Sequence, residues 1–237
     1  MSTQLRDGSI VEDVRLDRIA MFDERSRSFP IRTMLKASRP RSYTWRCLNW
    51  LDQGREGACV GFGIGHELIA RPAEAKTVDY SYARQQIYWE AQRIDPWAGG
   101  AYPGASPFYE GTSVLAGVKV ARRLGWFESY RWAFGLEDLM MGVGYNGPAV
   151  LGLAWFEGMF WPDSDGYIHP TGRCVGGHCI LCRAVNVKAR RFTLRNSWGK
   201  GWGMDGDCYV TFEEMDTLLR QRGEAVFFLK RHRKAQP

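Results

Sequence analysis

A single cysteine, Cys59, stands where the chain could use it as a nucleophile. It ends the glycine-rich turn within LDQGREGACVGFG at 51–63 and begins an apolar stretch typical of a helix. The turn lacks the Lys and Ser/Thr of a phosphate-binding loop. At a helix N-terminus, backbone N–H groups and the helix macrodipole favour a thiolate. We therefore expect Cys59 to attack a carbonyl, provided that a histidine base lies nearby and is held in place by a third group.

One of the four histidines suits the role of base. His66 lies in the same helix as Cys59, two turns on, His169 precedes a proline in a loop, and His232 belongs to the basic end of the chain. His178 follows two glycines and begins an apolar strand, a rigid mounting for a base. We expect His178 to face Cys59.

An amide side chain follows His178 by eighteen residues. The stretches 178–187 and 190–196 read as two strands of a hairpin, which would return Asn196 to the neighbourhood of His178. An amide there can bond one ring nitrogen and hold the imidazole toward the thiol.

A structural zinc site is the competing interpretation of this region. Cys174, His178, Cys179 and Cys182 crowd one short stretch. Zinc usually takes two separated ligand pairs on turns, whereas residues 179 and 182 would point to opposite faces of one strand. We expect no metal, and six free thiols rather than disulfides, because no secretory signal opens the chain.

The composition is that of a folded globular protein. The chain has 237 residues, 45% of them apolar, with ten Trp, ten Tyr and twelve Phe. No run of 18 apolar residues occurs, so no membrane span is expected. A net charge of +6 is modest and no nucleic-acid motif is present. Without a signal peptide, we expect a cytoplasmic protein, with association with a larger particle left open.

The elements that must position these residues fall into two groups. The pattern predicts helices first, then mostly antiparallel strands, with a long Pro/Gly-rich loop at 95–111. The expected helices are 59–70, 81–94, 112–125 and 213–223, and the expected strands are 148–156, 178–187, 190–196, 208–212 and 225–230. This order predicts an α+β fold of two lobes with a cleft between them.

The expected domain organisation follows from the same pattern. Residues 1–44 are charged and aperiodic, and we expect a short leader or an arm that lies on the surface and leaves the core intact. A single domain would follow at 45–237, with a helical lobe at about 45–145 and a β-rich lobe at about 146–230. A basic tail, 231–237, would end the chain.

In combination, the motifs resemble the papain-like cysteine peptidases. Three blocks carry the resemblance in chain order: Gln53 six residues before Cys59, Gly177-His178 ahead of an apolar strand, and NSWGKGWG at 196–203. The segment 109–125 is similar to the family's substrate-side turn and helix. The resemblance covers about residues 45–230, and NSWGKGWG is its most specific part.

The resemblance implies a role for each matching residue. Cys59 would be the nucleophile, His178 the acid and base, and Asn196 the group that orients His178. The Gln53 amide and the Cys59 backbone N–H would form the oxyanion hole, a contribution of about 3–4 kcal/mol per donor.

Four further residues are implied to line the substrate site. Gly111 and Thr112 would form the non-primed side of the cleft, with Gly177 beside the base. Trp198 would shield the bond between His178 and its asparagine from water.

The chain also departs from the family's usual pattern. The cysteines that form a disulfide in secreted members are replaced by Glu56 and Tyr109, the Trp after the nucleophile by Val60, and a second glycine by Thr112. These departures resemble a disulfide-free variety, closer to bacterial and bacteriophage members.

The resemblance implies a cysteine-type peptidase, an endopeptidase, that hydrolyses peptide bonds through a Cys–His thiolate–imidazolium pair and an acyl-enzyme. It would act on peptide or protein substrates and need no cofactor. Two alternatives remain open at the level of sequence. One is a structural or binding component of a larger assembly, joined through residues 1–44, that keeps the fold without using the site. The other is amidase or acyl-transfer chemistry by the same Cys–His pair.

Overall fold

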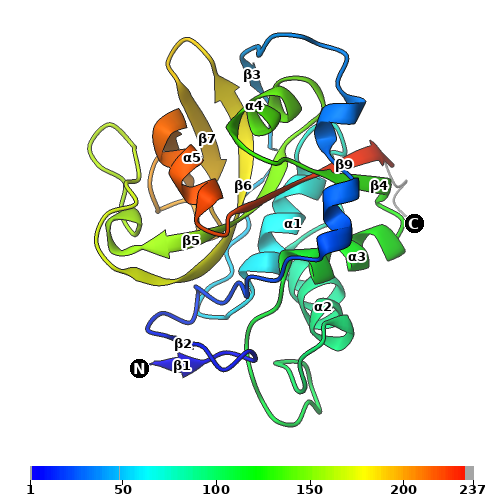
Figure 1. Cartoon of the computed structure of the whole chain (residues 1–237). Helices are drawn as coiled ribbons and strands as arrows, with labels where there is room; N and C mark the ends of the chain where they lie inside the picture. The colour runs from blue at the N-terminus through cyan, green and yellow to red at the C-terminus, as the bar shows by residue number, and fades with distance from the viewer. Residues whose placement is uncertain (1, 48, 233–237) are drawn as a thin grey trace.

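An antiparallel sheet and its flanking helices form the body of the protein (Figure 1). The computed structural model describes residues 2–47 and 49–232. Within them a seven-stranded sheet has the order β4-β9-β5-β6-β7-β8, with β3 paired to β6, and every pairing is antiparallel. Its strands are β3 Tyr43–Thr44, β4 Phe127–Trp132, β5 Ala149–Phe156, β6 Cys174–Asn186, β7 Arg191–Arg195, β8 Asp207–Thr211 and β9 Glu224–Arg231.

Helices lie on both faces of this sheet (Figure 1). The longer ones are α1 Cys59–Ile69, the π-helical η3 Tyr82–Trp89 continuing into α2 Glu90–Ile94, α3 Val114–Arg123, α4 Leu136–Tyr145 and α5 Phe212–Arg220. Short elements complete the described chain: β1 Thr3–Gln4, β2 Ile10–Val11, and the 3₁₀ turns η1 Glu24–Ser28, η2 Ile31–Met34 and η4 Glu157–Met159. No helix in the described part has the length and apolar character needed to span a membrane.

The glycines of α1 are explained by how closely other elements pack on this helix. A Cβ atom at Gly61 would lie 2.4 Å from the Ala83 carbonyl oxygen, and one at Gly63 would lie 2.7 Å from the Cys179 sulfur. Glycine weakens a helix by about 1 kcal/mol relative to alanine. Glycine is required here because α1 packs closely on η3 and β6. This close packing fixes the position of Cys59 at the first turn of the helix.

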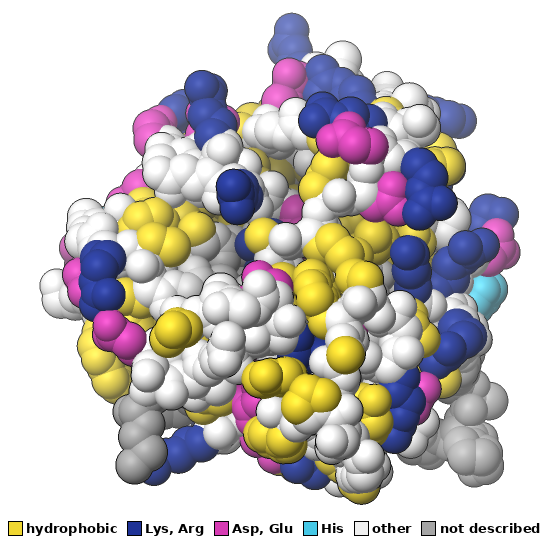
Figure 2. Space-filling model, turned by 60° about the horizontal axis from the view of Figure 1, so that its bottom comes forward, with side chains coloured by type: hydrophobic (Ala, Val, Ile, Leu, Met, Phe, Trp, Pro, Cys, Tyr) yellow, Lys and Arg dark blue, Asp and Glu magenta, His cyan; other side chains and the backbone are white. Residues whose placement is uncertain are grey.

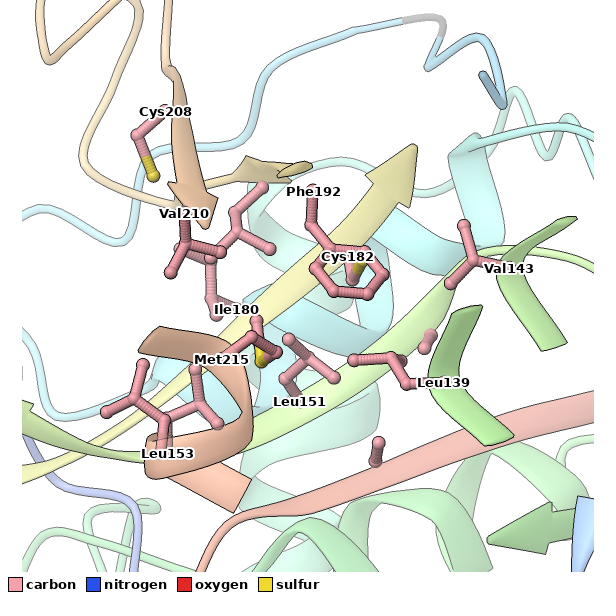
Figure 3. Close-up of a cluster of buried hydrophobic side chains, with 14 of the residues drawn as sticks. Leu139, Val143, Leu151, Leu153, Ile180, Cys182, Phe192, Cys208, Val210 and Met215 are labelled. Carbon is pink, nitrogen blue, oxygen red and sulfur yellow. The ribbon is translucent and has the colours of Figure 1, made fainter. Parts of the chain in front are cut away.

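Alternating residues of β5 and β6 divide the interior into two cores. Leu151 and Ile180 point to the side of α4 and α5, whereas Val150 and Leu181 point to the side of α1 and α3. Figure 3 shows the first of these clusters, in which Met215 of α5 and Leu139 of α4 meet the strand side chains. Because successive residues of a strand point to opposite faces, this one sheet contributes side chains to both cores.

Residues 127–145 differ from the expected boundary between a helical and a β-rich lobe. β4 lies within this span and pairs with the C-terminal β9, and α4 contributes Leu139 and Val143 to the core on the α5 side. Neither element was predicted. The interior residues of β4 are exposed or half-buried without clear alternation, and the α4 sequence LEDLMMGVGY contains two glycines.

The N-terminal residues are more deeply integrated than the surface arm expected from sequence. Leu16 and Ile31 are fully buried in the core on the α5 side, and Leu5, Val11 and Ile19 form a smaller cluster. The expectation that residues 1–44 leave the core intact is therefore wrong. In Figure 1 the blue chain that follows β2 passes the lower end of α1 on its way to η1. The predicted basic tail, 231–237, lies outside the described residues from position 233 onward.

The surface carries mixed charges. On the face in Figure 2, Lys and Arg side chains lie mostly toward the rim, several with Asp or Glu beside them, and apolar side chains gather near the centre. That face has no broad region of a single sign.

Candidate active site

Cys59 lies at the first turn of α1, fully buried, as its place in the sequence predicts. Its Sγ is 2.8 Å from Oδ1 of Asp17, and the backbone N–H of Cys179 on β6 donates to the same sulfur at 3.3 Å. The Cys59 backbone N–H also donates to Asp17 Oδ1, at 3.3 Å. A carboxyl group from the N-terminal arm, residues 1–44, is thus in direct contact with the sulfur of the candidate nucleophile.

His178 and Asn196 are brought together by the β6–β7 hairpin, as predicted. The pairing of Leu181 with Arg195 sets the register, and His178 Nε2 lies 2.7 Å from Asn196 Oδ1. Because an amide oxygen only accepts, Nε2 carries the proton and Nδ1 is the basic nitrogen of the neutral ring. Both residues are buried.

Two indole rings enclose the imidazole. Trp198 has its ring centroid 4.9 Å from that of His178, and the ring of Trp155 on β5 meets the imidazole edge-on at 4.7 Å. Both indoles are largely shielded from solvent. The shielding role implied for Trp198 fits this arrangement, whereas Trp155 had no signal in the sequence beyond its place in an apolar strand.

Hydrogen bonds hold Gln53 to Ser197, to Glu56 and to the arm. Its Oε1 accepts from Ser197 Oγ at 2.6 Å and its backbone N–H donates to the Ser197 carbonyl at 2.8 Å. Its Nε2 donates to the Glu56 carbonyl at 2.8 Å and to the Arg15 carbonyl of the arm at 3.4 Å. The two expected oxyanion donors, the Gln53 amide and the Cys59 N–H, therefore both contact the arm.

The residues expected to bind substrate also contact the arm. The Gly177 carbonyl accepts from the Arg18 N–H at 3.1 Å, and the Thr112 carbonyl accepts from the Ile19 N–H at 2.9 Å. A Cβ at Gly111, whose φ is +95°, would lie 2.9 Å from the Asp17 carbonyl oxygen.

The arm also reaches Trp198, because the Arg15 guanidinium lies over that ring, 4.4 Å from its centre. Residues 13–19 thus pass across the whole site. Nothing in the sequence of this charged, aperiodic stretch singles it out, and this contact was missed.

The protonation states follow from burial. Desolvation raises the pKa of Asp17 well above its usual value, and raises that of the Cys59 thiol, with the neighbouring Asp17 charge adding to the effect. Burial lowers the pKa of His178 to about 4, against the opposite effect of its bond to Asn196. With the arm in place, the Cys59 thiol and the His178 imidazole are therefore both neutral at pH 7.

The expected thiolate–imidazolium pair is accordingly not formed in this state. The Cys59 sulfur bonds to Asp17 and to the Cys179 backbone, and the described residues form no hydrogen bond between it and His178. The reason is physical: the carboxyl group excludes water and supplies no positive charge to stabilise a thiolate.

The remaining cysteines do not form a metal site. In the range that the structure describes, no group of three or more His, Cys, Asp or Glu side chains is arranged to hold a metal ion. All six cysteines have free thiols. Cys179 and Cys182 lie in different cores, on opposite faces of β6.

Comparisons with known proteins find similarity to cysteine proteases. Cathepsin B-like protease 1 of Arabidopsis thaliana is 28% identical over 128 residues, covering 48% of this chain and 34% of that protein. Cysteine proteinase 3 of Entamoeba histolytica is 25% identical over 198 residues, covering 74% of this chain and 64% of that protein. These similarities support a papain-like peptidase family for this chain. It spans less than two thirds of the length of these relatives.

A solved structure shows the same fold. The structure of xylellain, a cysteine protease from Xylella fastidiosa, superimposes with a TM-score of 0.62 at 14% identity, covering 94% of this chain and 98% of that one. The α+β fold is thus the papain-like one, as expected. No family model matches the sequence. The bacterial or bacteriophage subtype stays a prediction.

Proposed function

We propose that this papain-like chain is a cysteine peptidase that cleaves peptide bonds through Cys59, His178 and Asn196. One observation carries the proposal: the Cys179 N–H on β6 donates to the Cys59 sulfur, and the neighbouring residue on β6 is His178, bonded to Asn196. This register presents a buried imidazole beside a thiol at a helix N-terminus, which is the arrangement that activates a cysteine.

The chemistry proceeds in two steps once the arm has left. Nδ1 of His178 takes the thiol proton, and Sγ attacks the substrate carbonyl carbon. The oxygen becomes an oxyanion, which the Cys59 N–H and the Gln53 amide stabilise. The imidazolium then protonates the departing amine, leaving a thioester, and a water molecule deprotonated by His178 hydrolyses it.

Cleavage within a chain, rather than at its ends, fits the path of the arm. Residues 13–16 lie on the Trp198 side of Cys59 and residues 18–19 on the Thr112 side. The site thus accommodates continuous backbone on both sides of the nucleophile. This favours an endopeptidase.

We further propose that residues 1–44 hold the enzyme latent. Asp17 presents a carboxyl group, not a peptide carbonyl, to Cys59, and its oxygen takes the Cys59 N–H that an oxyanion would need. A carboxyl in this position is a poor electrophile and keeps the thiol protonated. The association of residues 1–44 with a larger assembly, expected as an alternative, stays a prediction.

Hydrolysis of a fluorescently labelled, unfolded protein tests the peptidase proposal. The full chain should show low activity, and the full-length double variant Asp17→Ala/Arg18→Ala, called the release variant below, should be at least about tenfold more active. Cys59→Ser should abolish the activity in either background, whereas Cys174→Ser, a change at an exposed thiol, should not alter it. Activity that survives Cys59→Ser would exclude this mechanism.

A further inference from the structure

An arginine of the N-terminal arm is enclosed by the loop that follows α2. Arg6 donates from Nη1 to Asp95 Oδ2 at 2.6 Å, and the side chains of both residues are fully buried. Its Nη2 donates to the Gln92 carbonyl at 3.0 Å and to the Trp97 carbonyl, and its Nε donates to the Ala98 carbonyl at 3.4 Å. These acceptors, all within residues 92–98, form the Arg6 socket. The planar fork of a guanidinium can reach them together, whereas a lysine ammonium offers its donors at a single point.

The body of the protein holds the socket in place through contacts that do not involve the arm. The Thr112 hydroxyl donates to Asp95 Oδ2 at 2.7 Å, and the Trp97 backbone N–H donates to Asp95 Oδ1 at 3.2 Å. Gln92 is fixed as well, because its amide donates to the Tyr88 hydroxyl at 3.0 Å. A buried carboxylate left without a cation is costly, so a vacated socket favours a ligand with a guanidinium group.

A hairpin of the arm presents the arginine to the socket. Strands β1 and β2 are paired antiparallel, and Arg6 lies in the turn between them. Leu5, the residue before it, is 3% exposed and clusters with Val11 and Ile19, and Trp97 of the socket packs against this cluster. The arginine and its apolar neighbour are thus held together, which favours recognition of a peptide segment over recognition of a guanidinium group alone.

Thr112 connects the socket to the catalytic cleft. Its hydroxyl donates to Asp95, and its carbonyl accepts from the Ile19 N–H, in the segment of the arm that covers Cys59. Residues 7–16 separate the two points at which the arm is fastened, Arg6 and Asp17. Two contacts on one chain strengthen each other by about 10²–10⁴-fold, because each keeps the other at a high local concentration. Loss of the contact at the socket therefore weakens the contact at Cys59.

We propose that the Arg6 socket is a peptide-binding site outside the catalytic cleft, specific for an arginine beside an apolar residue, and that its occupant controls release of the arm. In the latent state the occupant is the arm's own hairpin. A partner protein that presents the same two side chains displaces residues 2–11, and residues 13–19 then lose their anchor. The inference rests on the proposed function, in which the arm holds the enzyme latent. The competing explanation is that the Arg6 ion pair only stabilises the fold.

Two variants of the arm distinguish these explanations. Arg6→Ala empties the socket, and Arg27→Ala, in an exposed ion pair with Glu24, is the matched control. Each full chain is treated with iodoacetamide at pH 8, and labelling of the buried Cys59 and of Cys182, in the core on the α5 side, is followed by peptide mass spectrometry. Labelling of Cys59 alone reports departure of the arm, and labelling of both cysteines reports unfolding.

We expect Cys59 to be labelled at least about tenfold faster in Arg6→Ala than in the unaltered chain, without labelling of Cys182, and we expect no change in Arg27→Ala. Equal labelling of Cys59 in the two variants would overturn the inference. Labelling of Cys59 and Cys182 together in Arg6→Ala would also overturn it, because the ion pair would then serve the fold.

Peptides added to the protein test the site itself. One has the sequence of residues 2–11, STQLRDGSIV, and the other carries citrulline in place of the arginine, which keeps the shape but is neutral. Only the arginine peptide should accelerate labelling of Cys59 in the unaltered full chain. In fluorescence anisotropy with Arg6→Ala, the arginine peptide should bind at least about tenfold more tightly than the citrulline peptide, and Asp95→Asn in that background should abolish the preference. Equal binding of the two peptides would overturn the inference.

Methylguanidinium is the third probe, and it separates a peptide site from a site for the guanidinium group alone. It should leave Cys59 labelling unchanged at the concentration at which the arginine peptide acts. Release of the arm by methylguanidinium at that concentration would contradict the proposed peptide specificity.

Hydrolysis of the labelled, unfolded protein separates failure of this inference from failure of the proposed function. If Cys59 labelling rises in Arg6→Ala but no variant hydrolyses the substrate, the socket controls the arm and the peptidase assignment is wrong. If the release variant hydrolyses the substrate while Arg6→Ala behaves like Arg27→Ala in both assays, the peptidase stands and the inference is wrong.

Discussion

At the scale of single residues, the base and its orienting group are the best-defined part of the site. The His178–Asn196 bond is 2.7 Å long, and indole rings lie against the imidazole from two sides. Shielding from water strengthens this bond and fixes the proton on Nε2. The geometry therefore assigns Asn196 a positioning role rather than a contact with substrate.

Replacing Asn196 with alanine should lower kcat by about 10²-fold and leave KM almost unchanged, because only the orientation of His178 is lost. Steady-state kinetics with a peptide substrate, together with the pH profile of kcat/KM, provide the measurement. Asn186→Ala, at the exposed end of β6, is the matched control. Full activity of Asn196→Ala would remove this residue from the mechanism.

Site residues could be predicted where short local patterns determine them. Cys59 begins a helix after a glycine-rich turn, and a two-strand hairpin is enough to bring Asn196 back to His178. Asp17 could not be predicted in this way. Its contact with Cys59 joins positions 42 residues apart, and nothing in its own charged surroundings indicates a buried carboxyl.

At the scale of elements, the N-terminal arm lies across the site, and we propose that it controls access to Cys59. Its main chain bonds the Gly177 and Thr112 carbonyls, and its side chains reach Cys59, Glu224 and Trp198. The residues expected to bind substrate are those that hold this segment. Under the proposed function, a segment held by so many contacts at the site would compete directly with substrate.

The docking of the arm should weaken as pH rises. Asp17 has a pKa well above 3.8 when docked, facing Cys59, Glu110 and Tyr88, and an ordinary one when the arm is free. A group whose pKa is raised by docking stabilises the docked arm. This stabilisation is fully present at pH values below the pKa of the undocked group. This favourable contribution is lost as the pH rises toward and through the docked pKa. Over that range the equilibrium constant for docking falls by up to about tenfold per pH unit.

The measurement compares peptide hydrolysis by the wild type with that by Asp17→Asn from pH 4.5 to 8. Asparagine keeps the acceptor oxygen but cannot ionise, so the ratio of wild-type to variant rates should increase with pH. Asp7→Asn, an exposed change elsewhere in the arm, serves as control. A ratio that stays constant, or falls, would contradict a carboxyl-held arm.

The elements that sequence could not predict have a common physical reason. The predicted helices and strands have strong periodicity or continuous apolar runs, as in α3 and β5. β4 and α4 acquire their structure from tertiary partners: β4 pairs with the C-terminal β9, and α4 packs on the core opposite α1. Such long-range contacts leave little trace in a local window.

At the scale of the whole molecule, one sheet separates two cores and one ion pair ties α1 to the last strand. Glu67 of α1 and Arg231 of β9 are 0% and 4% exposed, with Nε to Oε1 at 2.5 Å. Burial raises the pKa of Glu67, and the adjacent guanidinium opposes that shift. Removing one member of such a pair leaves a buried charge without its partner.

Glu67→Ala should therefore destabilise the protein by about 3–5 kcal/mol, or roughly 6–20 °C in Tm. The double variant Glu67→Gln/Arg231→Met should lose less than Arg231→Met alone, because no unpaired charge remains. Glu213→Ala, in an exposed pair with Arg190, is the control and should cost at most about 1 kcal/mol. A Tm loss in Glu67→Ala no larger than in Glu213→Ala would contradict this assignment.

Selective alkylation tests most directly the claim that Cys59 is a nucleophile held latent by the arm. The full chain, the release variant, and the release variant with His178→Ala are treated with iodoacetamide at pH 5.5, and the labelled cysteines are mapped by peptide mass spectrometry. Cys59 should react slowly in the full chain, where it is buried beneath a carboxyl group. In the release variant it should react faster than the exposed Cys174, because only a thiolate paired with an imidazolium persists at this pH. The selectivity should fall sharply when His178 is replaced. If Cys59 reacts no faster than Cys174 after the arm is released, the ion pair does not form and the account of this site is wrong.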